Sequence, residues 1–530
     1  MNRFGRLFVA TLIGCLLAGF FPALAQTPAI SLADRTAIAK LRDEAGSLVR
    51  EQMELSWKRR TTGEKTDLAA TYNGHEKLFS IDSLLLLMRA EAAATNPDEK
   101  KAYGFFRDYL LGEMVGMRVA GLNDEIDAYL AGARFDYSGK NYAYYELPRL
   151  LRDEKDYAAR QELSNAVAPI LREANERYRR KEQRLQRLAK ELGFADYLAL
   201  AAQLRHVDLT AFAATCKQFL DDSQKGFVKL QNWAVPFQLG FPADKLRRCD
   251  TMRLFGAERF AAYFGKDELL PRWRSFLGGL GLPADKIKVD DADRPRKSPR
   301  AMCYPVAVPG DVRLTLIPAA GFAEYQALWH ETGHAQQAAN TTAGLWEFQQ
   351  LGDHAATDAF AFLFDGLFAD PGFLRRAFNF KEEDATAFGR FVAYQRLYQL
   401  RRYCAKVLYE MVLHRGLEEP LKAYRGWHGQ AAAIALDEND GLRCYADADD
   451  FLAGADYVRA WLLEATLAAD LARRYGEDWY AQPAAGAYLR SWWSKGRYYR
   501  AAELAAQAGR KQIEPQDYFR RLKPLVKGKY

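Results

Sequence analysis

The sequence predicts a mainly α-helical protein, and three observations indicate this class. Hydrophobic residues recur at helical spacing through most of the 530 residues, as expected of helices that bury one face. The alternation of hydrophobic and polar residues that is typical of a half-buried strand is clear over 312–316. No Pro/Ser/Gly-rich linker and no internal repeat divides the chain, although its length would permit several domains.

The predicted helices follow from the amphipathic runs, taken in chain order. A long polar stretch, 285–300, is predicted as a loop because it has neither helical nor strand periodicity. The helical runs are 32–58, 76–95, 98–132, 142–192, 207–235, 252–280, 321–340, 351–366, 382–416 and 451–475.

The N-terminus has the pattern of a secretory signal peptide, 1–25. Arg3 and Arg6 form a basic start, and the apolar run 7–21 is short for a membrane span. Small residues precede a cleavage point after Ala25. We therefore expect an exported protein, periplasmic or secreted, with no transmembrane segment once the signal is removed.

Two alternatives for this segment stay open. The signal could remain uncleaved as an anchor. Cys15 also follows a Leu-Ile-Gly sequence that is typical of lipidation sites, although the chain stays apolar after it.

Charge and cysteine content exclude some functions. The chain has 75 basic and 68 acidic residues, and this small excess does not indicate a nucleic-acid partner. The basic stretch 177–190 contains Glu182 and helically spaced leucines, so we interpret it as a solvated helix face. No C-x-x-C motif suggests a cysteine metal site, and up to two disulfides are possible in an oxidising compartment. The cysteines beyond the signal are Cys216, Cys249, Cys303, Cys404 and Cys444.

The most informative motif is H-E-x-x-H over 330–334, which uses two of only seven histidines. In the predicted helix 321–340, His330 and His334 lie one turn apart on the same face, so both imidazoles can reach one metal ion. Glu331 would lie beside that ion and could take a proton from water. Gly333 costs about 1 kcal/mol inside a helix relative to alanine, which indicates close approach by substrate or by another helix. A chance match with two core histidines is the alternative.

A third metal ligand is expected, because catalytic zinc normally has three protein ligands. Asp358 lies 24 residues after His334 on the predicted helix 351–366. His354 is one turn earlier on the same face, where it could bind the metal, hydrogen-bond the carboxylate, or simply line a cleft. The predicted zinc site is therefore His330, His334 and Asp358, with the role of His354 open.

These motifs resemble those of the helical zinc peptidases typified by thimet oligopeptidase and angiotensin-converting enzyme. The segment 351–364 is similar to the family pattern L-G-D-x-x-x-T-E-x-x-A-F-L-F-E up to its last position, with Asp358 in place of the ligand Glu. Because Asp is one methylene shorter, its helix must lie closer or the site must be looser. The resemblance covers roughly residues 295–505, and upstream of this range it is faint.

The resemblance implies a two-lobed helical fold with a deep cleft and a small β-sheet beside the metal helix. It implies one domain over 26–530, with an N-terminal helical lobe at 26–205 and the metal site within 206–530. The implied activity is zinc-dependent hydrolysis of short peptides, with Glu331 as general base. In the family a strand like 312–316 lies at a sheet edge along the cleft, and an ordinary structural hairpin is the alternative.

The same resemblance implies further site residues. Tyr457 lies in a segment similar to a family Y-L-R-A-W sequence and would donate to an oxyanion, although a core tyrosine is equally compatible. The second tyrosine of the converting-enzyme branch is replaced by Ala460. His428 and Tyr445 are placed near the site only by analogy.

Two other functions remain open. A non-catalytic peptide-binding protein on a degenerate peptidase scaffold would explain Asp358 and Ala460, but it gives no reason to retain Glu331. A zinc carboxypeptidase would keep the metal and recognise a different part of the substrate. The sequence does not distinguish endopeptidase from exopeptidase action.

Overall fold

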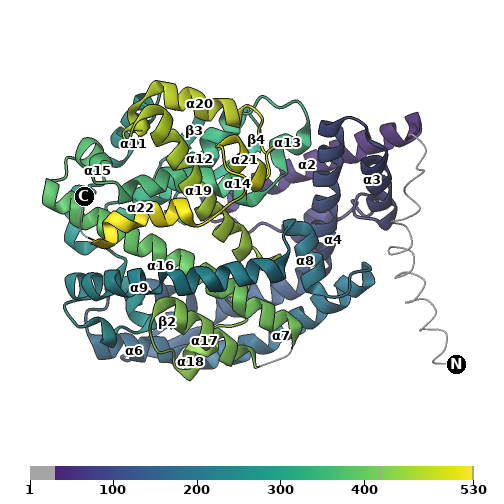
Figure 1. Cartoon of the computed structure of the whole chain (residues 1–530). Helices are drawn as coiled ribbons and strands as arrows, with labels where there is room; N and C mark the ends of the chain where they lie inside the picture. The colour runs from purple at the N-terminus through teal and green to yellow at the C-terminus, as the bar shows by residue number, and fades with distance from the viewer. Residues whose placement is uncertain (1–29, 417–418, 528–530) are drawn as a thin grey trace.

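The computed structural model describes residues 30–416 and 419–527. The predicted signal peptide and its alternatives lie outside these residues. The mainly α-helical class is confirmed, with 71% of residues in helices and 5% in strands. Figure 1 shows a largely helical molecule with strands at two separate places, and with the N-terminal helices on one side. Among the described residues no helix is both long and apolar enough to cross a membrane. The five described cysteines are free thiols.

Eight of the predicted runs form one helix each, with ends that differ by a few residues. The first of them begins with a capping box, in which Ser31 accepts from the Asp34 amide and the Asp34 side chain accepts from the Ser31 amide. These helices are α2 (Leu32–Thr62), α3 (Ile81–Ala93), α4 (Pro97–Gly132), α9 (Leu209–Leu239), α12 (Phe322–Ala339), α14 (His354–Asp365), α16 (Glu382–Arg415) and α19 (Gly454–Tyr475).

The predicted run 142–192 is wrong as a single helix. It begins with strand residues and then breaks where Pro148 and Pro169 start new helices and where Asp156 caps another. Proline fits the first turn of a helix but not its interior, so each proline sets a boundary. The run takes in the end of a hairpin, β1 (Arg134–Tyr137) and β2 (Lys140–Ala143), and the helices α5 (Leu147–Asp153), α6 (Tyr157–Ala166) and α7 (Ala168–Glu191).

Other helices were not predicted, and many of them are short. The run 252–280 divides into α10 (Thr251–Leu254), a 3-10 helix (Glu258–Tyr263) and α11 (Leu269–Gly279). The remaining helices are α8 (Tyr197–Arg205), α13 (Trp346–Gln350), α15 (Pro371–Phe378), α17 (Pro420–Ala432), α18 (Glu438–Gly441), α20 (Pro483–Trp493), α21 (Ala501–Gln507) and α22 (Gln516–Lys527).

The larger sheet has three strands in the order β3-β5-β4. Its strands are β3 (Ile287–Asp290), β4 (Met302–Ala307) and β5 (Asp311–Thr315), with β5 parallel to β3 and antiparallel to β4. The predicted strand 312–316 is confirmed as β5, but its expected position at the sheet edge is wrong because β5 is central. The edge strand beside α12 and α2 is β4. The predicted loop 285–300 also contains β3, which is too short to show a period.

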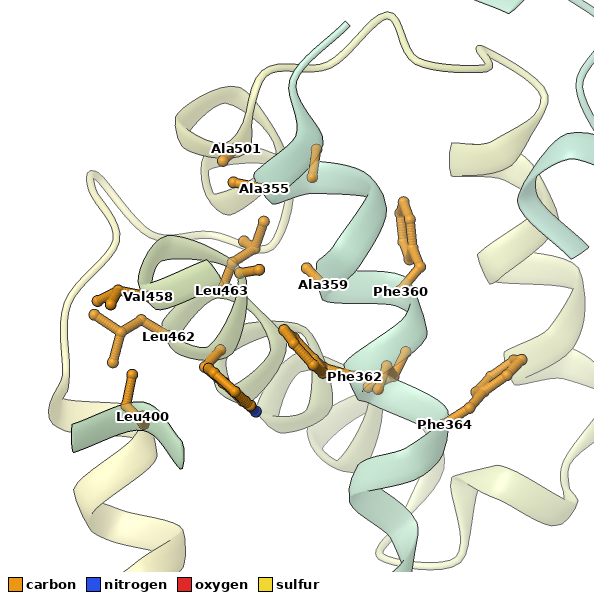
Figure 2. Close-up of a cluster of buried hydrophobic side chains, with 14 of the residues drawn as sticks. Ala355, Ala359, Phe360, Phe362, Phe364, Leu400, Val458, Leu462, Leu463 and Ala501 are labelled. Carbon is orange, nitrogen blue, oxygen red and sulfur yellow. The ribbon is translucent and has the colours of Figure 1, made fainter. Parts of the chain in front are cut away.

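Buried residues from both halves of the chain share one hydrophobic core. The largest cluster runs from Ile38 to Leu525 and includes most of α12, α14, α16 and α19. Figure 2 shows part of it, where Ala359 of α14 faces Leu463 of α19, and Leu462 points away from α14 towards Leu400. Phe362 stacks on Trp461 with ring centroids 4.3 Å apart. This core fixes α14 between α12 and α19.

Gly333 explains how closely α12 and α14 approach. A Cβ atom at this position would lie 2.5 Å from the Cα atom of Ala361 and 2.5 Å from the carbonyl oxygen of Phe360, both backbone atoms of α14. Close approach to this glycine was expected from substrate or from another helix, and the structure places a helix against it. The absence of a side chain brings the two helices that carry the predicted metal ligands into backbone contact.

We expect Gly333→Ala to lower the free energy of unfolding by roughly 1–3 kcal/mol, as overpacking does in well-packed cores. This cost exceeds the gain of about 1 kcal/mol in helix propensity, because backbone atoms must move. Urea denaturation would measure it. Gly121, inside α4, is the matched control, because a Cβ atom there meets nothing within 4 Å. Gly121→Ala should be stabilising, and equal effects of the two substitutions would contradict the contact.

Candidate metal centre

His330, His334 and Asp358 come together as predicted. Each offers a ligand atom, and these three atoms lie within 4.8 Å of one another. The histidines come from α12 and the aspartate from α14, so the site depends on the contact between these helices. His334 Nε2 lies 3.5 Å from Asp358 Oδ1. Two ligand atoms bound to one tetrahedral zinc at about 2.0–2.2 Å would be roughly 3.4 Å apart, so this pair already has the spacing of a metal site.

A buried carboxylate orients His330. Its Nδ1 lies 3.1 Å from Asp365 Oδ2, and Asp365 in turn forms an ion pair with Arg396. Because a carboxylate paired with arginine only accepts hydrogen bonds, Nδ1 must donate, which leaves the Nε2 lone pair of His330 for a metal. Burial alone would lower the pKa of His330, but Asp365, with Glu331 and Asp358, raises it.

This orienting network extends to the end of the chain. Arg396 also binds Glu464 at 2.9 Å, and Glu464 accepts from Arg521 of α22 at 2.5 and 2.6 Å. Asp365 and Glu464 were not predicted as functional residues. A signal for Asp365 did exist, because it is seven residues after Asp358 and therefore on the same face of a strongly apolar helix.

Glu331 is held at the sheet edge. Its Oε2 atom accepts a hydrogen bond of 2.8 Å from the backbone amide of Cys303 on β4. The other carboxylate oxygen of Glu331, Oε1, takes no part in this hydrogen bond. Glu331 also raises the pKa of the neighbouring His330, so its negative charge faces the metal-ligand group. The edge strand therefore positions the proposed base, a role that the sequence did not reveal.

Asp358 is ionised in this setting. Burial would raise the pKa of its carboxyl group, but the facing His334, with contributions from His330 and His354, lowers it. Two imidazoles and one carboxylate form a donor set that binds zinc and other divalent metals. The group offers three protein ligands, which is the number that leaves one position open in catalytic zinc sites.

His354 lies at the start of α14 and outside this three-residue group. It lines a cavity of about 390 Å³ together with residues of α2, α4, α8 and α19. Asp353 caps α14 by accepting from the Ala355 amide at 2.9 Å, and it pairs with Arg459 at 3.0 Å. The cavity therefore opens beside the first turn of the helix that carries Asp358.

The other candidate residues are placed differently. Tyr457 packs against Tyr403 and Phe362, with ring centroids at 4.8 and 6.4 Å. Burial and the charge of Asp358 raise the pKa of Tyr457, so its hydroxyl stays protonated and can donate. His428 lines a separate small cavity, and Tyr445 packs against the cluster that contains Tyr409 and Tyr424.

Compared with protein-family models and with curated protein sequences, the chain matches none.

Proposed function

We propose that the chain is a zinc-dependent peptidase that hydrolyses short peptides. The observation that carries this proposal is the convergence of His330, His334 and Asp358 beside the carboxylate of Glu331. A metal-ligand set alone would serve a structural ion. A carboxylate held next to a three-ligand set supports hydrolysis, because such a group can move a proton.

The mechanism assigns a step to each residue. When bound, zinc supplies a Lewis acid that acidifies water and polarises a peptide carbonyl. His330, His334 and Asp358 would hold it, with His330 oriented by Asp365. Glu331 takes the proton from the attacking water and then delivers it to the leaving amine nitrogen.

Tyr457 would complete the site as a hydrogen-bond donor. Its raised pKa keeps the phenol protonated at neutral pH, so it can donate to the oxygen that becomes negative during attack. In the converting-enzyme branch a second tyrosine would also donate a hydrogen bond. Here the corresponding position is Ala460, which is buried and has no hydroxyl group. In this proposal Tyr457 acts alone.

The proposed architecture is the two-lobed peptidase fold. It is supported by the cavity, which is lined on one side by α2 and α4 and on the other by 350–354 and α19. Its volume of about 390 Å³ would accommodate a few residues of an extended chain and not a folded protein. With the proposed signal peptide, the substrates would be short peptides outside the cytoplasm.

The alternative is a peptide-binding protein without activity. It is favoured by Asp358 in place of glutamate and by Ala460. Against it, Glu331 is retained and is positioned by a backbone hydrogen bond. Glu331 has no obvious role in a protein that only binds peptides.

Zinc content tests the proposal. We expect the purified protein to hold about one zinc per chain, and His330→Ala or His334→Ala to lose it, because two protein ligands bind zinc weakly. Elemental analysis after dialysis would measure this. His75→Ala is the matched control, because His75 pairs with Glu44 at 2.7 Å in the N-terminal region. A wild-type protein that stays metal-free in excess zinc would refute the peptidase and leave the binding protein.

A further inference from the structure

We propose that Arg497 binds a carboxylate group of the substrate in the cavity beside the metal-ligand residues. This inference deepens the proposed function and depends on it for the nature of the ligand. It names the feature by which substrates would be selected. The candidate sources of the carboxylate are the C-terminus of a peptide and an acidic side chain.

Arg497 is held firmly at the wall of the cavity. Its backbone amide donates to the Phe348 carbonyl at 2.7 Å, and its Nη1 donates to the Gln350 carbonyl at 2.9 Å. Gly352 has φ +142°, and a Cβ atom there would lie 2.7 Å from the Cβ of Arg497. The segment before α14 is thus shaped around this arginine. A guanidinium fixed in this way loses little entropy on binding.

The position of Arg497 connects the cavity with the site of chemistry. Arg497 lines the cavity together with His354. Asp358, a metal-ligand residue, is near enough for its negative charge to act on Arg497. A ligand group bound to Arg497 would therefore lie close to the reacting bond.

The other arginines of the cavity each have a carboxylate within ion-pair distance, at close range for two of them. Arg459 pairs with Asp353 at 3.0 Å and with Asp456 at 2.6 Å, and Arg205 pairs with Asp456 at 2.5 Å. The remaining one, Arg500, lies 3.9 Å from Asp108.

Arg497 differs from these three. Within 30–416 and 419–527, no carboxylate oxygen lies within the 4.0 Å ion-pair distance of its guanidinium. Its side-chain hydrogen bond goes to a backbone carbonyl, and the guanidinium has further donors on a side chain that lines the cavity. Burial lowers the pKa of Arg497, and the negative charge of Asp358 offsets this only in part.

A carboxylate is the ligand that meets these conditions best. The planar guanidinium donates two parallel hydrogen bonds to a carboxylate, and charge-assisted bonds of this kind are about twice as strong as neutral ones. A phosphate would bind the same fork, but peptides that reach the metal-ligand group supply carboxylates. Loss of the pair should weaken binding roughly 10- to 100-fold.

The test measures peptide binding to the zinc-loaded Glu331→Gln protein, so that turnover does not interfere. Three acetylated peptides of the same neutral sequence serve as probes. One ends in a free carboxylate, one in an amide, and one in an amide with a single aspartate. We expect a carboxylate-bearing peptide to bind roughly 10- to 100-fold more tightly than the neutral amide. Adding Arg497→Gln should abolish this difference. The peptide that binds more tightly, the one with a free C-terminus or the one with an aspartate, identifies the source of the carboxylate.

Controls separate recognition from structure. Arg490→Gln is the matched variant, because Arg490 also donates to a backbone carbonyl, that of Gly281, outside the cavity. It should leave the affinity ratio unchanged. Arg497→Lys keeps the charge and should retain part of the ratio even if the glutamine variant folds poorly. Equal weakening of all three peptides by Arg497→Gln, or a loss of zinc, would overturn the proposal and leave a structural arginine.

The proposed function can fail separately. Hydrolysis by wild type with no preference for carboxylate-bearing peptides would refute the role of Arg497 and leave the peptidase intact. Arg497-dependent binding by a protein that cleaves none of the peptides would refute the peptidase and leave the carboxylate site intact.

Discussion

Glu331→Gln is expected to abolish peptide hydrolysis while zinc stays bound. Loss of a general base typically costs roughly 10²–10⁴-fold in rate. The amide oxygen of glutamine can still accept from the Cys303 amide, a bond of 2.8 Å in the native protein, so the side chain should keep its place. The substitution therefore removes the proton acceptor and little else. Cleavage of a peptide library, followed by mass spectrometry, would measure the loss.

Glu324→Gln is the matched control on the same helix. Glu324 lies in the first turn of α12, two turns before Glu331, and its removal should leave hydrolysis unchanged. Zinc content and thermal unfolding of both variants should equal those of wild type. Retained hydrolysis in Glu331→Gln would show that the activity belongs to another group or to a contaminant.

The local parts of the site could be predicted from sequence. The prediction of His330, Glu331 and His334 depends only on the period of one helix. The prediction of Asp358 depends on a second helix whose sequence pattern is recognisable. Gly333 signalled a close approach, and the structure places α14 against it. Each of these inferences uses residues fewer than about thirty positions apart, where periodicity carries the information.

The remaining parts depend on contacts between distant segments. Arg396 meets both Asp365 and Glu464 only because α14, α16 and α19 pack together. The hydrogen bond from Cys303 to Glu331 requires β4 to lie at the sheet edge, and the predicted edge was β5. No local pattern encodes strand order. Arg497 belongs to a loop nearly 140 residues after Asp358, so its place in the cavity could not be predicted.

The packing of the two helices would explain a shorter ligand at position 358. Gly333 lets α14 approach α12 until backbone atoms touch. At this separation an aspartate reaches the histidines, with its Oδ1 atom 3.5 Å from His334 Nε2. A glutamate would extend one methylene further, and its side chain would have to bend to present an oxygen at the same point. A shorter ligand requires either a closer helix or a looser site, and the structure thus favours the closer helix.

Asp358→Ala is therefore expected to lose zinc, because two histidines remain as the only protein ligands. Asp358→Glu should retain zinc with lower affinity than wild type, because its side chain is too long for the helix spacing. His354→Ala should cost no more than the roughly 10- to 100-fold of a residue that acts through a ligand. Competition with a fluorescent chelator would rank the three variants. Tighter binding by Asp358→Glu would show that helix spacing does not select aspartate, and loss of zinc from His354→Ala alone would move the third ligand one turn along α14.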